Sequence, residues 1–337
     1  RVGGHIPTDR QIMTATDTVP HFIAGRARPH DGSRFGEVFD PNTGRVARRV
    51  GLDGVASVHA AVEAAARAQP AWAATNPQRR ARVLFAFKAL VEREMDALAR
   101  MLSLEHGKTL PDARGDVQRG LEVIEFACGI PHLQKGEYTE GAGAGIDVYS
   151  MRQPLGVVAG ITPFNFPAMI PMWKFAPAIA CGNAFVLKPS ERDPSVPMRL
   201  AALMIEAGLP AGVLNVVNGD KEAVDVLLTD PRMQAVGFVG SSAIAEYVYA
   251  TGCAHGKRVQ CFGGAKNHMI VMPDADIDMA ADAAVSAAFG SAGERCCATT
   301  VPTARRPPRP TGFPATATRS SATSTPRHTA IRRATRS

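Results

Sequence analysis

The 337-residue sequence lacks three features that would place it in a specialised class of protein. Its longest apolar run is interrupted by Pro171, Lys174 and Pro177, so no run reaches the ~20 residues that a membrane-spanning helix needs. Its first residues do not follow the pattern of a secretory signal. Its six cysteines form no Cys-x-x-Cys pair and show no metal-ligand spacing with histidine. These absences exclude a disulfide-stapled peptide and favour a cytoplasmic protein with free thiols, no bound metal and no membrane partner.

The positive charge of the chain is confined to residues 301–337. The net charge of +7 includes eight arginines in this segment, which has no acidic residue, so the first 300 residues carry a net charge of −1. The segment also has six prolines and only three larger hydrophobic residues. Ordering it would cost on the order of 50 kcal/mol, at ~1.5 kcal/mol a residue, against ~2 to 3 kcal/mol for each apolar side chain. We expect a disordered basic tail, and its lack of interleaved aromatic residues argues against binding to nucleic acid.

The remaining sequence predicts an α/β fold. Short extended runs with turn signals occupy residues 20–50, and apolar residues at helical spacing predict helices over 55–74, 77–106 and 110–128. Strands and helices then alternate, with strands over 156–162, 184–188, 213–217 and 235–239, and helices over 167–181, 195–207, 221–228 and 243–251. Continuous apolar strands separated by helices of this length indicate a parallel sheet covered on both faces.

Polar or glycine-rich segments follow three of these strands, at Thr162–Pro167, Lys188–Arg192 and Phe238–Ser242. Parallel strands bring their carboxyl ends to one edge of a sheet, which is where such sheets bind ligands. Each segment alone also fits an ordinary turn, a helix N-cap or a strand-end charge. Together they favour a pyrophosphate site at a helix start, with Lys188 reaching ribose hydroxyls. The usual Gly-x-Gly-x-x-Gly fingerprint is absent, so that motif gives no support.

The same segments resemble, in order and spacing, the signatures of the NAD(P)-dependent aldehyde dehydrogenase superfamily. The resembling segments are Ile161–Pro167, Leu187–Arg192, Phe238–Ser242 and Gly293–Cys296. Four further segments resemble the CoA-acylating methylmalonate-semialdehyde dehydrogenases: Gly256–Gln260, Gly264–His268, Met272–Asp276 and Gly290–Cys296. The resemblance covers about residues 20–298 and implies a Rossmann-like NAD domain followed by the beginning of a catalytic α/β domain.

The resemblance also implies roles for single residues. Cys296 is the nucleophile, and the cation of Arg295 beside it favours the thiolate, which attacks an aldehyde carbon. Asn165 and the backbone N–H of Cys296 would stabilise the oxyanion that results. Cys297 is the weaker candidate, because the family thiol directly follows the Gly-x-Arg segment. Arg119 and Arg295 are the candidate partners of a substrate carboxylate. The cofactor contacts implied are Thr162, Phe164, Lys188, Glu191, Arg192, Ser241 and Gly263.

The fate of the resulting thioester depends on Cys261, which stands where hydrolytic relatives have a water-activating glutamate. A general base contributes ~10²- to 10⁴-fold, so hydrolysis should be slow and the thiol of coenzyme A should take the acyl group. Methylmalonate semialdehyde would give propionyl-CoA after loss of its carboxylate carbon, and malonate semialdehyde would give acetyl-CoA. The family suggests valine or inositol breakdown as the pathway. A disulfide between Cys261 and Cys296 stays open if the sulfurs approach.

The predicted organisation has five segments. We expect a flexible N-terminus at 1–19, an NAD-binding domain at 20–138 and 153–261, a linker or oligomerisation arm at 139–152, an incomplete catalytic domain at 262–300 and the tail at 301–337. Family members are homotetramers. The resemblance stops at Ala298, and the composition beyond it resembles a GC-rich gene read out of frame. Three alternatives therefore stay open: an inactive fragment that retains only NAD binding, a dehydrogenase for another aldehyde, and an interaction protein that acts through its tail.

Overall fold

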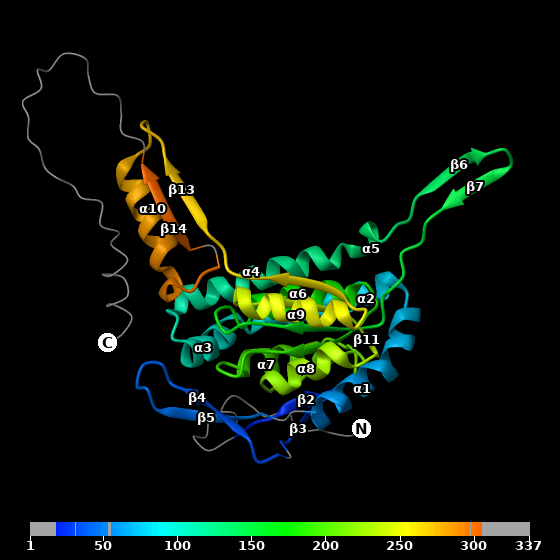
Figure 1. Cartoon of the computed structure of the whole chain (residues 1–337), viewed down its shortest axis with the longest axis horizontal. Coiled ribbons are helices and arrows are strands. Elements are labelled where there is room, and N and C mark those ends of the chain that lie inside the picture. Colours follow the sequence, from blue (N-terminus) through cyan, green and yellow to red (C-terminus); the bar gives the residue numbers. More distant parts are fainter. Residues whose placement is uncertain (1–17, 31, 53–54, 297, 305–337) are drawn as a thin grey trace, which may run out of the picture.

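A seven-stranded sheet forms the centre of the molecule (Figure 1). The computed structural model describes residues 18–30, 32–52, 55–296 and 298–304. The parallel strands, in spatial order, are β12 (Arg258–Phe262), β11 (Met233–Val239), β8 (Val157–Ile161), β9 (Ala184–Lys188) and β10 (Leu214–Val216). Two antiparallel strands, β2 (His21–Ile23) and β3 (Arg26–Arg28), continue the sheet beyond β10. The predicted α/β class with a parallel sheet is confirmed.

Helices cover both faces of this sheet because its strands are apolar on both sides. Val158 and Phe185 pack into one core with α6 (Met169–Ala180) and α7 (Ser195–Glu206). Their neighbours Val157 and Ala184 pack into a second core. That core is formed with α1 (Val55–Ala74), α8 (Lys221–Thr229) and α9 (Ser242–Ala254). Successive side chains of a strand point to opposite faces, so one apolar run supplies both cores.

The sheet has a switch point between β8 and β11. From β8 the chain moves through β9 to β10 on one side, and it then returns to place β11 and β12 on the other side of β8. The loops after β8 and β11 therefore open at the same end of neighbouring strands. Such crevices are the usual ligand-binding position in open parallel sheets.

The outer helical layer corrects one prediction. The single helix expected over 77–106 is two helices, α2 (Pro77–Arg93) and α3 (Met95–His106), joined at Glu94. The Glu94 carboxylate accepts hydrogen bonds from Arg199 Nε, at 2.7 Å, and from Arg199 Nη2 on α7. This tertiary ion pair accompanies a break that no glycine or proline marks in the sequence.

The layer is completed by α4 (Leu110–Cys128) and the short α5 (Ile130–Leu133). Helix α4 packs on α6, so two helical layers cover this face of the sheet. Across the described ranges, none of the helices is long and apolar enough to cross a membrane.

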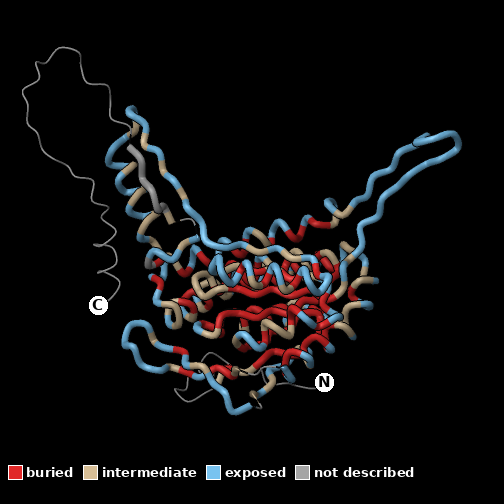
Figure 2. Tube along the Cα trace, in the orientation of Figure 1, coloured by how far each residue is buried: buried red, intermediate tan, exposed pale blue. Residues whose placement is uncertain are grey.

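Two segments project from this body, as Figure 1 shows. One is an antiparallel hairpin, β6 (Tyr138–Gly143) with β7 (Ile146–Tyr149), whose residues are all exposed. It begins one residue before the arm predicted over 139–152 and otherwise lies within it. The other, here called the C-terminal lobe, contains β13 (Asn267–Val271), α10 (Ile277–Phe289), the 3₁₀ turn η1 (Gly290–Gly293) and β14 (Thr299–Ala304). Figure 2 shows that burial is concentrated in the body and sparse in both projections.

Both predicted terminal segments need correction at their inner ends. Thr18 and Val19, expected in a flexible N-terminus, form β1, which pairs with β5 (Val46–Gly51) beside β4 (Phe35–Phe39). Residues 301–304, expected in the tail, form the end of β14 and pair with β13 in parallel. Backbone hydrogen bonds to a neighbouring strand do not depend on side-chain composition, from which the tail was predicted. The rest of both predictions, 1–17 and 305–337, lies outside the described residues.

Candidate active site

The loop after β8 is held at the mouth of the switch-point crevice. Thr162 N donates to Lys188 O at 3.1 Å, which extends the pairing of β8 with β9. Within the described ranges, neither Thr162 Oγ1 nor Asn165 Oδ1 has a hydrogen-bond partner, although both atoms are buried. Buried polar atoms are normally hydrogen-bonded, so these two atoms leave hydrogen-bonding capacity in this loop that a polar ligand could use.

The predicted nucleophile lies next to this loop. Asn165 Nδ2 donates to the backbone oxygen of Glu294 at 2.6 Å, two residues before Cys296. Cys296 is exposed, and its backbone oxygen accepts a hydrogen bond from Asn267 Nδ2 at 2.8 Å. The fold therefore brings Asn165 to the nucleophile segment, although the two lie 129 residues apart in the sequence.

The two arginines predicted to bind a substrate carboxylate have different surroundings. Arg295 Nη2 lies 2.8 Å from Asp112 Oδ1, near the start of α4. A β-carbon at Gly290 would lie 2.7 Å from Arg295 Cζ, so a side chain at this position would displace the guanidinium. Arg119 is exposed on α4, and its backbone oxygen accepts from Trp173 Nε1 at 3.1 Å. Arg295 is thus engaged by a carboxylate of the chain itself, and the role of both arginines stays a prediction.

Five of the predicted cofactor residues, Thr162 among them, lie at the ends of β8 and β9. Lys188 Nζ forms an ion pair with Glu191 Oε2 at 2.9 Å. Burial alone would raise the pKa of the Glu191 carboxyl, but the charge and hydrogen bond of Lys188 lower that pKa below its usual value. The Arg192 guanidinium lies 4.7 Å from the centre of the Phe164 ring. These contacts bring the predicted residues together on two adjacent strand ends.

The remaining two predicted cofactor residues lie where β11 and β12 meet the start of α9. Ser241 is the N-cap of this helix, and its side chain makes no capping hydrogen bond. A β-carbon at Gly263 would lie 3.1 Å from Ser242 Cα, so glycine allows the chain after β12 to approach the helix start. Gly264 N donates to Ser242 Oγ at 3.0 Å, which fixes this approach. The first backbone N–H groups of a helix favour an anion such as a pyrophosphate.

These features fit a dinucleotide. The start of α9 offers backbone N–H groups for phosphates, and Thr162 Oγ1 is buried without a partner in the described structure. Lys188 carries further N–H donors at the end of β9. The donors lie on both sides of the switch point, where an extended ligand would cross from one half of the sheet to the other.

Cys261 has the half-buried position of an unreactive thiol. Burial raises the pKa of this thiol, against the opposite effect of the nearby Lys174 ammonium. Cys261 is not part of a disulfide in the structure. The thiol form of Cys261 is a poor base toward water, in agreement with the absence of a glutamate at this position.

The sequence reasoning missed Lys108, Asp116 and His106. Lys108 Nζ donates to the backbone oxygen of Asn165, and its side chain is fully buried against that of Asp116. His106 Nε2 lies 3.3 Å from Glu294 Oε2. Charged residues usually face solvent, and nothing in the local sequence pattern distinguishes these three from solvated ones.

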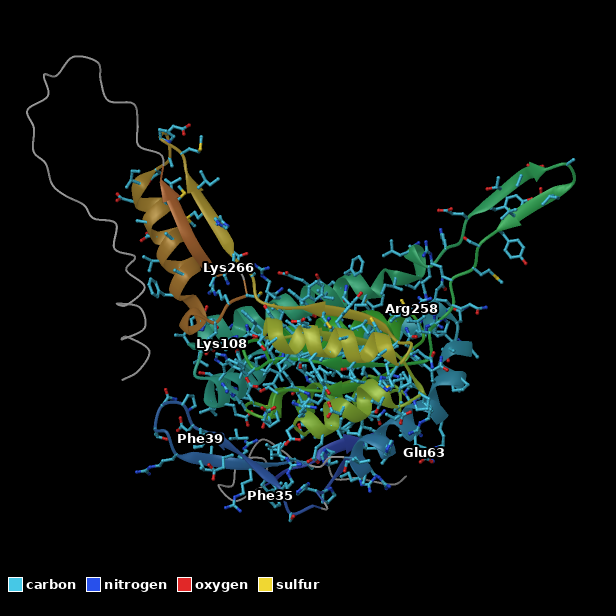
Figure 3. The ribbon with its side chains drawn as sticks, viewed as in Figure 1. Phe35, Phe39, Glu63, Lys108, Arg258 and Lys266 are labelled. Atoms are coloured by element: carbon cyan, nitrogen blue, oxygen red, sulfur yellow. The ribbon has the colours of Figure 1, made fainter. Side chains whose placement is uncertain are left out.

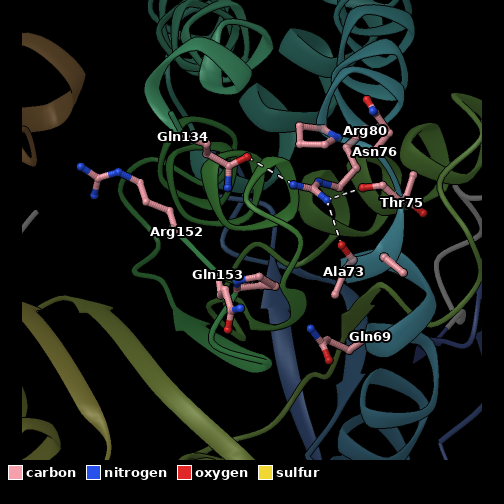
Figure 4. Close-up of a pocket in the computed structure, with 11 residues that line it drawn as sticks. Gln69, Ala73, Thr75, Asn76, Arg80, Gln134, Arg152 and Gln153 are labelled. Atoms are coloured by element: carbon pink, nitrogen blue, oxygen red, sulfur yellow. Dashed lines mark hydrogen bonds between the residues drawn. The ribbon is translucent and has the colours of Figure 1, made fainter. Parts of the chain in front are cut away.

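A cavity of about 570 Å³ lies apart from these residues, between the end of α1, the start of α2 and the segment after β7 (Figure 4). Arg80 is among the residues that line the cavity. The Arg80 guanidinium donates to the backbone oxygens of Ala180, at 3.0 Å, and Ala73, at 3.2 Å. None of the predicted site residues lines this cavity. Arg80 therefore joins the ends of α1 and α6 and does not mark the reaction site.

Comparisons with known proteins agree with this geometry. The profile of the aldehyde dehydrogenase family matches residues 28–306. A malonate-semialdehyde dehydrogenase of Pseudomonas aeruginosa is 54% identical over 84% of this chain and 57% of its own length. An acylating mitochondrial methylmalonate-semialdehyde dehydrogenase of Arabidopsis thaliana is 49% identical over 83% of this chain and 46% of its own length.

A solved structure gives the same result. The crystal structure of a putative methylmalonate-semialdehyde dehydrogenase from Sinorhizobium meliloti, complexed with NAD, has a TM-score of 0.84 and 65% identity. The match covers 86% of this chain and 59% of that protein, so the chain spans less than two thirds of the relatives it matches. On the family profile, the identities and the shared fold, the chain belongs to the aldehyde dehydrogenase family.

Proposed function

We propose that the chain carries the NAD-binding and nucleophilic parts of a CoA-acylating semialdehyde dehydrogenase. The reaction oxidises methylmalonate semialdehyde to propionyl-CoA, or malonate semialdehyde to acetyl-CoA, through a thioester on Cys296, and in both cases the carboxylate carbon of the substrate leaves as carbon dioxide before the acyl group is transferred to coenzyme A. The observation that carries the proposal is the 2.6 Å hydrogen bond from Asn165 Nδ2 to Glu294 O, because it brings an oxyanion donor to the nucleophile segment. The names of the Pseudomonas, Arabidopsis and Sinorhizobium relatives support the substrate class and, for the last, the cofactor.

The first chemical step belongs to Cys296 and Asn165. The Cys296 thiolate attacks the aldehyde carbon, and negative charge develops on the former carbonyl oxygen. One N–H of the Asn165 amide is held by Glu294 O, which orients the amide and leaves its second N–H for that oxygen. When bound, NAD supplies the acceptor for the hydride that leaves the carbon. Cys296 then carries the acyl group as a thioester.

Release of the acyl group requires a second nucleophile. Cys261 occupies the position of a water-activating base and does not act as one, because burial raises the pKa of its thiol. The thiol of coenzyme A is a better nucleophile than water and would take the acyl group, which regenerates Cys296. A carboxylate on the substrate would bind Arg119, which is exposed, or Arg295 if this residue exchanges Asp112 for the substrate.

The test uses the purified chain with NAD and malonate or methylmalonate semialdehyde. Without coenzyme A we expect at most one equivalent of NADH per chain, because the acyl group stays on Cys296, and continuous NADH formation once coenzyme A is added. Cys296→Ala should lower the rate on the order of 10⁴-fold or more, whereas Cys261→Ala serves as the matched control and should retain the burst. Continuous NADH formation without coenzyme A would contradict the acylating reaction.

A second candidate function is NAD binding without turnover. It is favoured by the C-terminal lobe, in which α10 has no buried residue, because its apolar side chains lack the surface against which they would pack. In that case NAD would raise the melting temperature, and no NADH would form with either semialdehyde.

Location and assembly are part of the same proposal. The free thiols support a cytoplasmic location. The β6–β7 hairpin supports a homotetramer, because Tyr138, Ile146 and Tyr149 are all more than half exposed on it. The molecular mass in solution, measured with the hairpin intact and with Ile146→Asp, tests the assembly.

A further inference from the structure

A buried ion pair lies beneath the loop that carries Asn165. Lys108 follows α3, Asp116 lies on α4, and Lys108 Nζ is 2.8 Å from Asp116 Oδ2. Both side chains are fully shielded from solvent. Figure 3 shows Lys108 in the body, beside the base of the C-terminal lobe. A buried pair of this kind is expensive to desolvate and is weak evidence for a role in stability alone.

The pair grips both ends of one short segment. Lys108 Nζ donates to the backbone oxygen of Asn165, and it lies 3.8 Å from the centre of the Phe166 ring. Asp116 Oδ1 accepts a hydrogen bond from the backbone N–H of Met169, the first residue of α6, at 2.7 Å. The two charged groups therefore bind the backbone at both ends of residues 165–169 and also form an ion pair with each other.

These contacts connect Lys108, through Asn165, to the segment 294–296 that contains the proposed nucleophile. With its backbone oxygen held by Lys108, Asn165 extends its amide to Glu294 O. Helix α4, which carries Asp116, packs against α6, so the support is part of the rigid body and not of the lobe. Oxyanion donors act only within a few tenths of an ångström of their ideal place, and a misplacement of ~1 Å can cost on the order of 100-fold in rate.

We propose that Lys108 is a positioning residue for the oxyanion donor Asn165, and that Asp116 holds Lys108 in place. The inference rests on the proposed function, because it assigns Asn165 to the oxyanion. Lys108 does not touch the aldehyde. By binding the backbone oxygen of Asn165, it fixes the position and the direction of the Asn165 side-chain amide.

The main variant replaces the pair by apolar residues, Lys108→Met with Asp116→Leu. Removal of one partner would strand a buried charge, whereas an apolar pair of similar volume preserves folding in comparable cases. We expect a melting temperature and an NAD affinity close to those of the wild type, with the rate of the NADH burst lowered on the order of 100-fold. Asn165→Ala should cause a loss of similar size, and the combined triple variant should lose little more, because both changes remove one effect.

The matched control is Lys257→Met. Lys257 is another buried lysine that donates to backbone oxygens, those of Asp230 at 2.7 Å and Met233 at 3.0 Å, away from the site. This control should lose stability and keep a burst rate within about threefold of the wild type. If the apolar pair does not fold, Lys108→Arg carries the test: the larger planar cation keeps the ion pair, displaces the donor from Asn165 O, and should lower the burst rate about tenfold.

A second readout separates this inference from the proposed function. Propanal labelled with ¹³C at its carbonyl carbon forms a thiohemiacetal with Cys296, and the ¹³C resonance of this adduct can be measured by NMR. The spectrum of Cys296→Ala, recorded in the same way, is subtracted as background. This measurement needs no hydride transfer. Adduct without NADH in the wild type would overturn the proposed function, and the effect of Lys108 would then be read from adduct stability. Absence of the adduct in the wild type would overturn both. A folded Lys108 variant with wild-type burst and adduct, or losses that multiply with Asn165→Ala, would overturn the positioning role.

Discussion

Helix α6 follows the loop that carries Asn165, and helix α10 precedes the segment that carries Cys296. The two helices are buried to opposite extents. Of the 12 residues of α6, eight are buried, whereas none of the 13 residues of α10 is. Both helices are apolar in composition, and Phe289 of α10 is 60% exposed while Phe175 of α6 is fully buried. Apolar sequence therefore makes a helix bury itself only where the chain also supplies the opposite surface. Asn165 belongs to the half that has this surface, and Cys296 to the half that lacks it.

The joint between these halves is polar. Besides the Asn165–Glu294 hydrogen bond, the C-terminal lobe is held to the body by the ion pair of Arg295 with Asp112. Each polar contact at a surface contributes little free energy. Hydrogen bonds nevertheless require narrower ranges of distance and angle than apolar contacts do. They place the nucleophile segment, but they add little to the stability of the lobe.

The largest expected effect comes from matched truncations in the two helices. Phe175→Ala leaves a cavity in the core of the body and should lower the free energy of unfolding by ~3 to 5 kcal/mol. Phe289→Ala removes an exposed side chain and should change it by less than ~0.5 kcal/mol. Urea unfolding followed by circular dichroism measures both variants. Equal losses would show that the lobe is packed as tightly as the body.

An intermediate effect is expected at the joint. Asp112→Asn removes the charge partner of Arg295 while keeping the shape of the side chain, and should speed deuterium exchange of residues 290–296 several-fold, with an unfolding free energy lowered by ~0.5 to 1 kcal/mol. Asp96→Asn is the control, because it breaks an exposed ion pair with Arg114, within the body. Equal exchange in both variants would mean that the joint does not hold the nucleophile segment.

An effect on stability of similar size is a pH dependence confined to the body. The hydrogen bond of Arg232 lowers the pKa of Asp230 to about 2, against the opposing effect of burial. A depressed pKa stabilises the fold above the unfolded value of 3.8, and this contribution is lost as the pH falls from about 4 to about 2. Asp230→Asn should therefore lower stability by on the order of 1 kcal/mol at pH 7, discounted for partial exposure, and by almost nothing near pH 2. A difference from the wild type that is constant with pH would contradict this cause.

The local pattern of the sequence was sufficient for the parallel sheet, and the ligand-binding edge that it predicts stays a prediction. The strands at 184–188 and 235–239 were predicted to within two residues, because a doubly covered strand needs a continuous apolar run. The break at Glu94 was missed, since its partner Arg199 lies 105 residues away. The strand at 299–304 was missed as well, because it forms by backbone hydrogen bonding to β13 and its sequence shows no pattern typical of a strand.

The sequence by itself determined the fold class and the family, and it predicted the chemical types at the proposed site: a thiol, an amide and a set of phosphate-binding donors. These follow from residue identity and from neighbours within a few positions, which a linear pattern records. Only the tertiary structure decided that Lys108 contacts the backbone of Asn165, that Arg295 is engaged by Asp112, and that Cys296, the proposed nucleophile, lies on a sparsely packed lobe. Each of these depends on groups far apart in the chain, and the distance between two such groups exists only after the chain has folded.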